Sequence, residues 1–434
     1  MQDQKGTGRP FRQFSKWLSA LAGLAIALLL GLMIYRLPTV QKRLSWRVDA
    51  ATTSLRTFFF PIGAMPTPVL AEPRVEIITR TALPTQNQSS HVQSTPLPVT
   101  PTIFNTPTPT ATDVPLPEQI SLPAPTYERQ DWNSCGPAAL AMILHFYGWE
   151  GSQEDINALI KPLRADRNVN IDELTSYVNQ QTTGLRAEYR VGGDISLLRR
   201  LLASGFPVII EETFYLPEGY WFNDDRWSGH YQVVTGYDNR SETFITQDSF
   251  VGPNRMMTYA ELNKNWQAFN RAYIIVYPIE KEEEVKAVLK EDWDVDINRQ
   301  HALETAYAET KSTPNNTYAW FNLGSNLVYF ERYPEAARAY DTARKLELPQ
   351  RMMRYQFGPF LAYFHSGRTE DLIAVADYAL KVTPNSEEAL LWKGWASFRL
   401  GQTSEALSLF QKALEARPGY KDALYALNYL QTGS

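Results

Sequence analysis

Cysteine is almost absent from this sequence of 434 residues, in which Cys135 is the only one. A single thiol cannot form an intramolecular disulfide, and it cannot build a zinc site that needs two or more cysteines. The five histidines show no HExxH motif or other close pair, so we expect neither a metal site nor a cofactor. They are His91, His145, His230, His301 and His365. Cys135 is therefore either a small buried apolar residue or a reactive thiol.

Long basic runs and phosphate-binding loops are also missing. The net charge is −5, and Lys and Arg are not clustered. Because nucleic acid binding needs clustered cations, we expect no nucleic acid partner. No GxxxxGK[ST] sequence occurs, so we expect no bound nucleotide. The length and a hydrophobic share of 44% allow two or three domains with cores of their own.

Charge is absent from residues 17–35, WLSALAGLAIALLLGLMIY. Such a run nearly matches the hydrocarbon core of a bilayer in helical length, and Trp17 and Tyr35 stand where interfacial aromatics would lie. A buried core helix would show a polar stripe, and a signal peptide would be followed by a small-residue cleavage site. We therefore predict a basic N-terminal tail (residues 1–16) and a single transmembrane anchor (residues 17–35).

Residues 36–125 are predicted to be a Pro/Thr-rich linker that forms a disordered stalk. Stretches such as STPLPVTPT and TPTPTATDVPLP cannot bury a core and favour extended conformations. Lys and Arg flank the apolar run evenly, so charge alone does not orient it. Because such stalks are commoner outside the cell, we expect the domains beyond it to be extracytoplasmic. A cytoplasmic linker is the alternative.

Residues 126–280 show helical patterns first and strand patterns afterwards, which is typical of an α+β fold. The helical segments are PAALAMILHFYG, SQEDINALIKPL, IDELTSYVNQ and ISLLRRLLASG, and the strands are PVIIEETF, HYQVVTGYD, TFITQDSF and AYIIVYP. Ser152 and Asp155 have the spacing of a capping box. Residues 239–242 read as the turn of a hairpin.

Cys135 lies at the start of the first of these helices, in QDWNSCGPAAL. A helix N-terminus offers free N–H groups and a positive dipole end, which lower the pKa of a thiol. The predicted hairpin brings His230, at the start of one strand, beside Asp248, at the end of the next. A nucleophile, a base and a third group that orients the base are what thiol activation requires.

These segments resemble the bacteriocin-processing, double-glycine leader peptidases of the papain-like cysteine peptidase superfamily. The resemblance covers residues 127–278 and rests on Cys-Gly-Pro-Ala-Ala, Gly-His-Tyr and Gln-Asp-Ser in that order. It implies a papain-like fold with Cys135 as nucleophile, His230 as general base, Asp248 as the orienting acid and Gln130 as an oxyanion donor. Gln130 stands one residue closer to the cysteine than in transporter-linked members, and Ser249 replaces their frequent Pro. Asp238 and Asn254 are alternative orienting residues.

Residues 281–434 are predicted to be helical, with a repeat that resembles the tetratricopeptide repeat. Three pairs of residues stand 34 positions apart, the period of that repeat: Gly367 and Gly401, Ala379 and Ala413, Pro384 and Pro418. A related unit begins near Trp320, and a degenerate one lies between Glu283 and Pro314. Such arrays bind proteins or peptides, or serve as scaffolds.

The sequence thus predicts a single-pass membrane protein with a cysteine peptidase domain, a peptide or protein substrate, and repeats that recruit a protein or peptide. A transpeptidase or cell-wall amidase with the same dyad, and an inactive peptide-binding scaffold, are the alternatives. An aromatic segment just before His230, FYLPEGYWFNDDRW, reads either as a lid or substrate-contact loop or as packing against the domain or the repeats.

Overall fold

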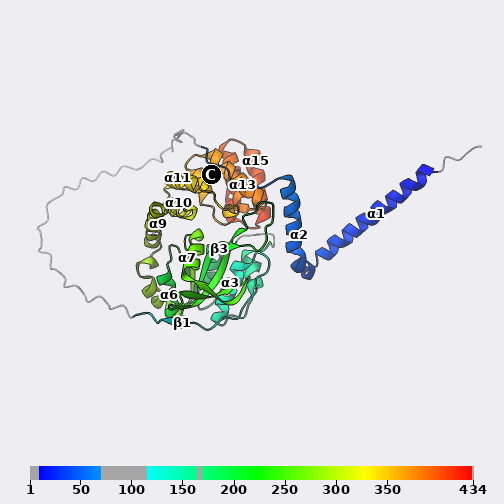
Figure 1. Cartoon of the computed structure of the whole chain (residues 1–434). Helices are drawn as coiled ribbons and strands as arrows, with labels where there is room; N and C mark the ends of the chain where they lie inside the picture. Colours follow the sequence, from blue (N-terminus) through cyan, green and yellow to red (C-terminus); the bar gives the residue numbers. More distant parts are fainter. Residues whose placement is uncertain (1–8, 70–114, 164–168, 433–434) are drawn as a thin grey trace, which may run out of the picture.

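The computed structural model describes residues 9–69, 115–163 and 169–432, and Figure 1 shows their arrangement. Part of the predicted basic tail (residues 1–8) and the middle of the predicted stalk (residues 70–114) lie outside the described residues. In the described part, a strand-and-helix unit is followed by a helical array that packs on it (Figure 1). The expected α+β domain and helical repeats are both present.

One antiparallel sheet forms the centre of the first unit. Its order is β2-β7-β3-β4-β5-β6, and β1 pairs with β4. The strands are β1 (Gln119–Ser121), β2 (Leu185–Arg190), β3 (Val208–Tyr215), β4 (Trp227–Asp238), β5 (Thr243–Asp248), β6 (Gly252–Thr258) and β7 (Tyr273–Pro278). The hairpin predicted around residues 239–242 joins β4 to β5. Because β1 belongs to this sheet, the unit begins before residue 126.

Helices cover both faces of the sheet. On one face lie α3 (Cys135–Phe146), α4 (Gln153–Ile160) and α5 (Ile171–Gln181), and on the other lie α6 (Ile195–Ala203), α7 (Tyr259–Trp266) and α8 (Glu282–Leu289). Side chains alternate along a strand, so Ile209 packs under α3 while Val208 and Ile210 pack under α6. This two-sided burial explains the unbroken apolar run in β3. The capping box of Ser152 and Asp155 begins α4 as predicted.

The helical array runs from residue 295 to residue 432. Its helices are α9 (Val295–Ser312), α10 (Thr317–Tyr329), α11 (Tyr333–Lys345), α12 (Gly358–His365), α13 (Thr369–Val382), α14 (Glu387–Arg399), α15 (Thr403–Ala416) and α16 (Lys421–Thr432). Gly324 and Gly394 admit the rings of Tyr340 and Phe410, since a Cβ at either glycine would lie within 2.6 Å of the ring. The helices of a pair can therefore approach closely.

Two features of the array depart from a regular series of repeat pairs. The middle pair is irregular, because a 3-10 turn (η4, Met352–Arg354) and a short α12 replace a full first helix. This accounts for the spacing of 36 residues between Ala343 and Ala379. The degenerate unit predicted from Glu283 is not a repeat pair, because Val285 and Leu289 of α8 are buried against the sheet.

The N-terminal region consists of α1 (Arg9–Tyr35) and α2 (Pro38–Phe59), and α1 extends away from the rest of the chain (Figure 1). Among the described residues, no helix combines the length and the apolar character needed to cross a bilayer. The prediction of a disordered stalk over residues 36–125 is wrong for both ends of this range, which are ordered. Residues 38–59 are helical, residues 60–69 pack on the repeats, and residues 119–121 pair with β4.

Candidate active site

Cys135, His230 and Asp248 come from three different elements and meet at one point. Cys135 is the first residue of α3, His230 lies near the start of β4, and Asp248 is the last residue of β5. The Nε2 atom of His230 lies 3.0 Å from Oδ1 of Asp248, and both side chains are buried. Since Nε2 is engaged with Asp248, the other ring nitrogen is left for Cys135, whose thiol hydrogen-bonds with the ring. The structure thus brings together three of the predicted residues.

The carboxylate of Asp248 is held by several donors. Its Oδ1 accepts the backbone N–H groups of Phe250 at 2.8 Å and Val251 at 3.0 Å, and Arg255 donates to Oδ2 at 3.2 Å. Burial raises the pKa of Asp248, but the hydrogen bond and charge of His230 and these N–H groups outweigh it and lower that pKa well below its ordinary value. Asp248 therefore remains ionised and fixes the imidazole.

The charges of the thiol and the imidazole are coupled. Burial alone raises the pKa of the Cys135 thiol, but the hydrogen bond to His230, the charge of His230 and the N–H of Tyr231 together lower it. Burial lowers the pKa of His230, whereas its hydrogen bonds to Asp248 and Cys135 raise it to about 10. Both shifts favour a thiolate–imidazolium pair at neutral pH.

Gln130 is held by the residue that follows Asp248. Its backbone N–H donates to the carbonyl of Ser249 at 3.0 Å, and the Ser249 hydroxyl donates to Oε1 of Gln130 at 3.0 Å. Because Oε1 is used as an acceptor, the Nε2 amide is the end of Gln130 that can donate to a substrate oxygen. Serine at position 249 thus has a positioning contact that proline could not make.

The two alternative orienting residues lie elsewhere. Asp238, at the far end of β4, accepts from the backbone N–H groups of Arg240 and Ser241 in the hairpin turn. Asn254 accepts from the side chain of Gln247. Neither contacts His230 in the structure.

Lys161 shapes the segment just before Cys135. This lysine is buried, and its Nζ donates to the carbonyls of Trp132 at 3.0 Å and Asn133 at 2.9 Å. Asn133 adopts the left-handed conformation with φ of 53°, which asparagine tolerates better than most residues. The charge of Lys161 also contributes to lowering the pKa of Cys135. Sequence reasoning missed Lys161, because nothing in IKPL marks it as a neighbour of the cysteine.

Residues 111–274 match the Peptidase_C39 like family. Residues 357–421 match a tetratricopeptide repeat. The predicted resemblance to these cysteine peptidases and to the repeats is confirmed.

Similar proteins cover single parts of the chain. A putative C39-like peptidase from Bacillus anthracis is 16% identical, with a TM-score of 0.30, and the match covers 37% of this chain and 98% of that one. The structure of a double glycine motif protease from an AMS/PCAT transporter in complex with the leader peptide is 20% identical, with a TM-score of 0.27, and the match covers 36% of this chain and 94% of that one.

A curated relative also matches part of the chain. The cytochrome c-type biogenesis protein CycH of Pseudomonas aeruginosa is 29% identical over 133 residues, which are 29% of this chain. The match spans 32% of the length of that relative.

Two buried acids lie behind the dyad of the C39-like domain. Glu212 pairs with His230 in the β3–β4 register, and Gln232 donates to its Oε1. Burial raises the pKa of Glu212 to about 8 and that of Glu211 well above its ordinary value. Burial therefore favours the neutral form of both acids. Two adjacent acids inside an apolar strand, PVIIEETF, were a signal that could have pointed to them.

The aromatic segment before His230 packs on both the C39-like domain and the repeats. Trp221 donates from Nε1 to Oε1 of Gln350 at 2.7 Å, and Trp227 is buried and stacks on Phe269 at 5.7 Å. The packing interpretation is therefore confirmed for these two rings. Phe222 is 88% exposed and remains available for other contacts.

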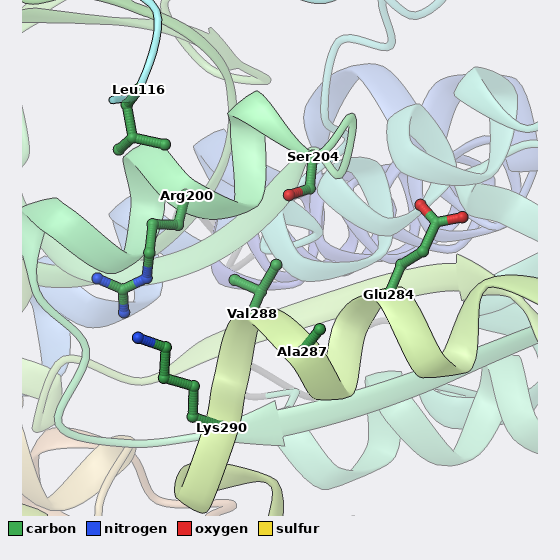
Figure 2. Close-up of a pocket in the computed structure, with 7 residues that line it drawn as sticks. All are labelled: Leu116, Arg200, Ser204, Glu284, Ala287, Val288 and Lys290. Atoms are coloured by element: carbon green, nitrogen blue, oxygen red, sulfur yellow. The ribbon is translucent and has the colours of Figure 1, made fainter. Parts of the chain in front are cut away.

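A separate cavity of about 400 Å³ lies between α6 and α8 of the C39-like domain (Figure 2). It is lined by Leu116, Arg200, Ser204, Glu284, Ala287, Val288 and Lys290. None of the four predicted site residues lines this cavity. In the part of the chain that the structure describes, no group of three or more His, Cys, Asp and Glu side chains is placed to hold a metal ion.

Proposed function

We propose that this protein is a cysteine peptidase that hydrolyses peptide bonds through an acyl-thioester on Cys135. The observation that carries the proposal is the meeting of Cys135, His230 and Asp248 from three elements, with the His230 ring held by Asp248 at 3.0 Å and interacting with the Cys135 thiol. A cysteine with a purely structural role at a helix start needs no imidazole beside it and no ionised carboxylate behind that imidazole. Burying these charged side chains costs free energy of folding. Such arrangements occur mainly where the charges take part in function.

The first half of the proposed reaction forms the acyl-enzyme. The Cys135 thiolate attacks the peptide carbonyl carbon, and the Nε2 amide of Gln130 donates to the oxygen on which negative charge develops. The His230 imidazolium then gives its proton to the leaving nitrogen. The C–N bond breaks, the amine product leaves, and the acyl group remains on sulfur as a thioester.

The second half releases the acid. Neutral His230 takes a proton from a water molecule, and the resulting hydroxide attacks the thioester carbon. The C–S bond breaks, the carboxylic acid product leaves, and the thiolate–imidazolium pair is restored. Asp248 keeps the ring orientation constant through both halves.

The substrate class is a peptide or protein, and the repeats recruit a protein or peptide partner. The apolar run of residues 17–35 serves as the membrane anchor, and the C39-like domain and repeats lie on the extracytoplasmic side. Exposed apolar side chains of α1, from Leu21 to Ile34, support an apolar environment for this helix. Resistance of the full chain to alkaline carbonate extraction, and digestion of its C-terminal part by external protease in intact cells, test this placement.

Turnover of a peptide library by the purified chain tests the reaction. Wild-type protein should release peptide fragments, and mass spectrometry after rapid acid quenching should find an acyl group on Cys135. Cys135→Ser should abolish turnover while thermal unfolding stays unchanged. Joined peptides in the presence of an added amine would indicate a transpeptidase. Absence of both turnover and acylation with every peptide would leave a binding scaffold.

A further inference from the structure

Residues 60–69, FPIGAMPTPV, cross the surface of the repeats without forming a helix or strand. Ile62, Met65 and Pro68 are buried, while Gly63, Ala64 and Thr67 are exposed. Burial at every third position is the pattern of a polyproline II conformation, which has three residues per turn and needs no internal hydrogen bonds. The segment therefore presents one apolar edge to the repeats.

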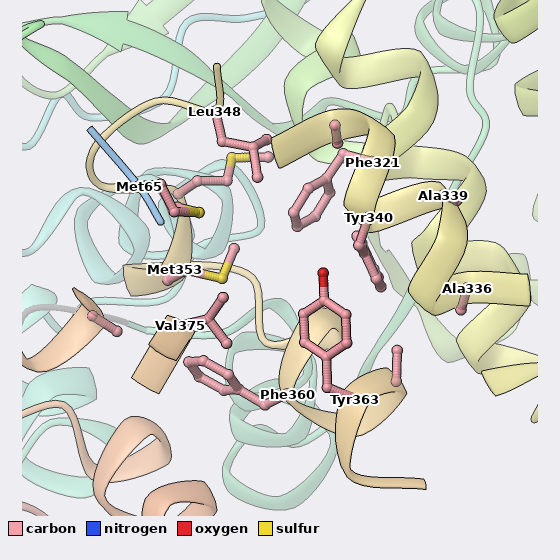
Figure 3. Packing of buried hydrophobic residues seen from close by; sticks show 14 of the residues in the cluster. Met65, Phe321, Ala336, Ala339, Tyr340, Leu348, Met353, Phe360, Tyr363 and Val375 are labelled. Carbon is pink, nitrogen blue, oxygen red and sulfur yellow. The ribbon is translucent and has the colours of Figure 1, made fainter. Parts of the chain in front are cut away.

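This apolar edge enters the core of the array. Ile62 and Met65 are only 6% and 7% exposed, and they belong to the buried cluster of the repeats. Figure 3 shows Met65 in this cluster with Leu348 and Met353. The same cluster contains Trp227, so it continues from the segment to the first residue of β4, the strand that carries His230.

Side chains of α11 and α13 also bind the backbone of the segment. Arg344 donates to the carbonyl of Pro66 from Nε at 3.1 Å and from Nη2 at 2.7 Å. The N–H of Val69 donates to Oδ1 of Asp371 at 3.0 Å, and the Tyr378 hydroxyl donates to the carbonyl of Gly63 at 3.1 Å. An extended backbone is recognised here at three points.

Arg344 and Asp371 form a buried ion pair at 2.9 Å, with side chains 0% and 2% exposed. A buried guanidinium is costly unless all of its N–H groups are bonded. The carbonyl of Pro66 accepts from Nε and Nη2, while Asp371 and Tyr363 accept from Nη1. The segment thus completes a charged pair that would otherwise need water.

We propose that residues 60–69 are an intramolecular ligand of the repeats, a clasp that fastens α1 and α2 to the C39-like domain and repeats without relying on the covalent connection through residues 70–114. The repeat surface selects an extended, proline-containing segment with an apolar residue at every third position. A partner peptide of this type competes for the same surface, whereas other partners bind elsewhere on the repeats.

The test separates the two parts after folding. A site for a specific protease is inserted between residues 70 and 114 of the full chain, which is purified in mild detergent through an N-terminal tag and then cut. The C-terminal fragment should stay on the tag resin. Met65→Asp should release it with an affinity weaker by about tenfold or more, because burial of a Met side chain is lost and a charge is buried. Thr67→Asp, at an exposed position of the same segment, is the matched control.

Each outcome decides the matter. Retention of the wild-type and Thr67→Asp fragments with release of the Met65→Asp fragment supports the clasp. Release of the wild-type fragment, or equal behaviour of the two variants, overturns it. Both substitutions lie outside the repeat helices, and thermal unfolding of the intact variants reports whether the array itself has changed.

Discussion

At the scale of single residues, the groups around His230 have two different tasks: Asp248 holds the ring as a permanent carboxylate, and Cys135 shares with the ring the proton that is transferred. Asp248 accepts from two backbone N–H groups and from Arg255 as well as from His230. A carboxylate with this many donors stays ionised, so the proton that moves in the proposed reaction is the one shared by Cys135 and His230. Among the three candidate orienting residues, it is Asp248 whose carboxylate contacts the His230 ring, while Asp238 and Asn254 bond elsewhere.

Asp248→Asn should lower kcat by a factor on the order of 10² to 10⁴, because an amide supports the wrong tautomer and no longer stabilises the imidazolium. Steady-state kinetics with a peptide substrate measures the effect. Asp238→Asn is the matched control, since the Asp238 side chain accepts from the hairpin turn at the far end of β4, and the kcat of this variant should stay within about twofold of wild type. Equal losses for the two variants would contradict the assignment.

Gln130→Ala should lower kcat by a factor on the order of 10² to 10³, because one oxyanion donor is lost. Ser249→Ala removes only the hydroxyl that holds Oε1 of Gln130, so its loss should be smaller but in the same direction. The two substitutions combined should cost little more than Gln130→Ala alone. Fully additive losses would show that Ser249 does not act through Gln130.

At the scale of elements, the N-terminus of α3 depends on a lysine from the segment after α4. Lys161 binds two carbonyls of the loop that precedes Cys135, and Asn133 in that loop has a left-handed backbone. The loop therefore has a fixed shape, which sets the position of the thiol at the start of α3. The positive charge of Lys161 adds to that of His230 in lowering the pKa of Cys135.

Lys161→Met should shift the labelling of Cys135 by iodoacetamide to higher pH. The sign follows from the charge: removal of a cation raises the pKa of the thiol, so the thiolate forms only at higher pH. Two carbonyls also lose their donor, which should cost about 1–3 kcal/mol of unfolding free energy. Lys264→Met, on the exposed side of α7, should change neither quantity. An unshifted profile in Lys161→Met would remove the lysine from the site.

The sequence predicted those elements whose side chains repeat with period 2 or 3.6, and it missed the others for physical reasons. The apolar edge of residues 60–69 has period 3, which matches neither a helix nor a strand, and its prolines suggested a free stalk. β6 has mostly polar or exposed residues, GPNRMMT, so no alternation marked it. His230 and Asp248 could be paired in advance because a hairpin is a local feature, whereas Cys135 was joined to them through its motif and the resemblance to known cysteine peptidases. Lys161, Ser249 and Glu212 could not, because their contacts depend on tertiary packing.

At the scale of the whole molecule, the repeats contact both sides of the dyad. Arg354 lies 3.5 Å from Oδ1 of Asn133, two residues before Cys135, and the Tyr355 hydroxyl lies 2.8 Å from that of Ser228, two residues before His230. Beside them, Arg351 binds both carboxylate oxygens of Asp224 at 2.7 Å. One short segment of the array, residues 351–355, thus contacts both the loop before Cys135 and the start of β4 before His230.

Arg351→Ala should cost about 3–5 kcal/mol of unfolding free energy, because it leaves the buried charge of Asp224 without its partner. Urea unfolding of the full chain measures this. Lys393→Ala breaks an ion pair with Asp377 whose side chains are 28% and 52% exposed, so its cost should be below about 1 kcal/mol. Similar costs for the two variants would contradict a structural coupling of repeats and C39-like domain through Arg351.

The pH dependence of Cys135 alkylation tests the thiolate–imidazolium pair most directly. The rate constant for iodoacetamide should be high and nearly constant at neutral pH, because the pKa of Cys135 is lowered and that of His230 is raised to about 10. In His230→Ala, the rate at neutral pH should fall and should rise only toward alkaline pH, as in the unfolded chain. A wild-type profile that coincides with those of His230→Ala and the unfolded chain would contradict the account.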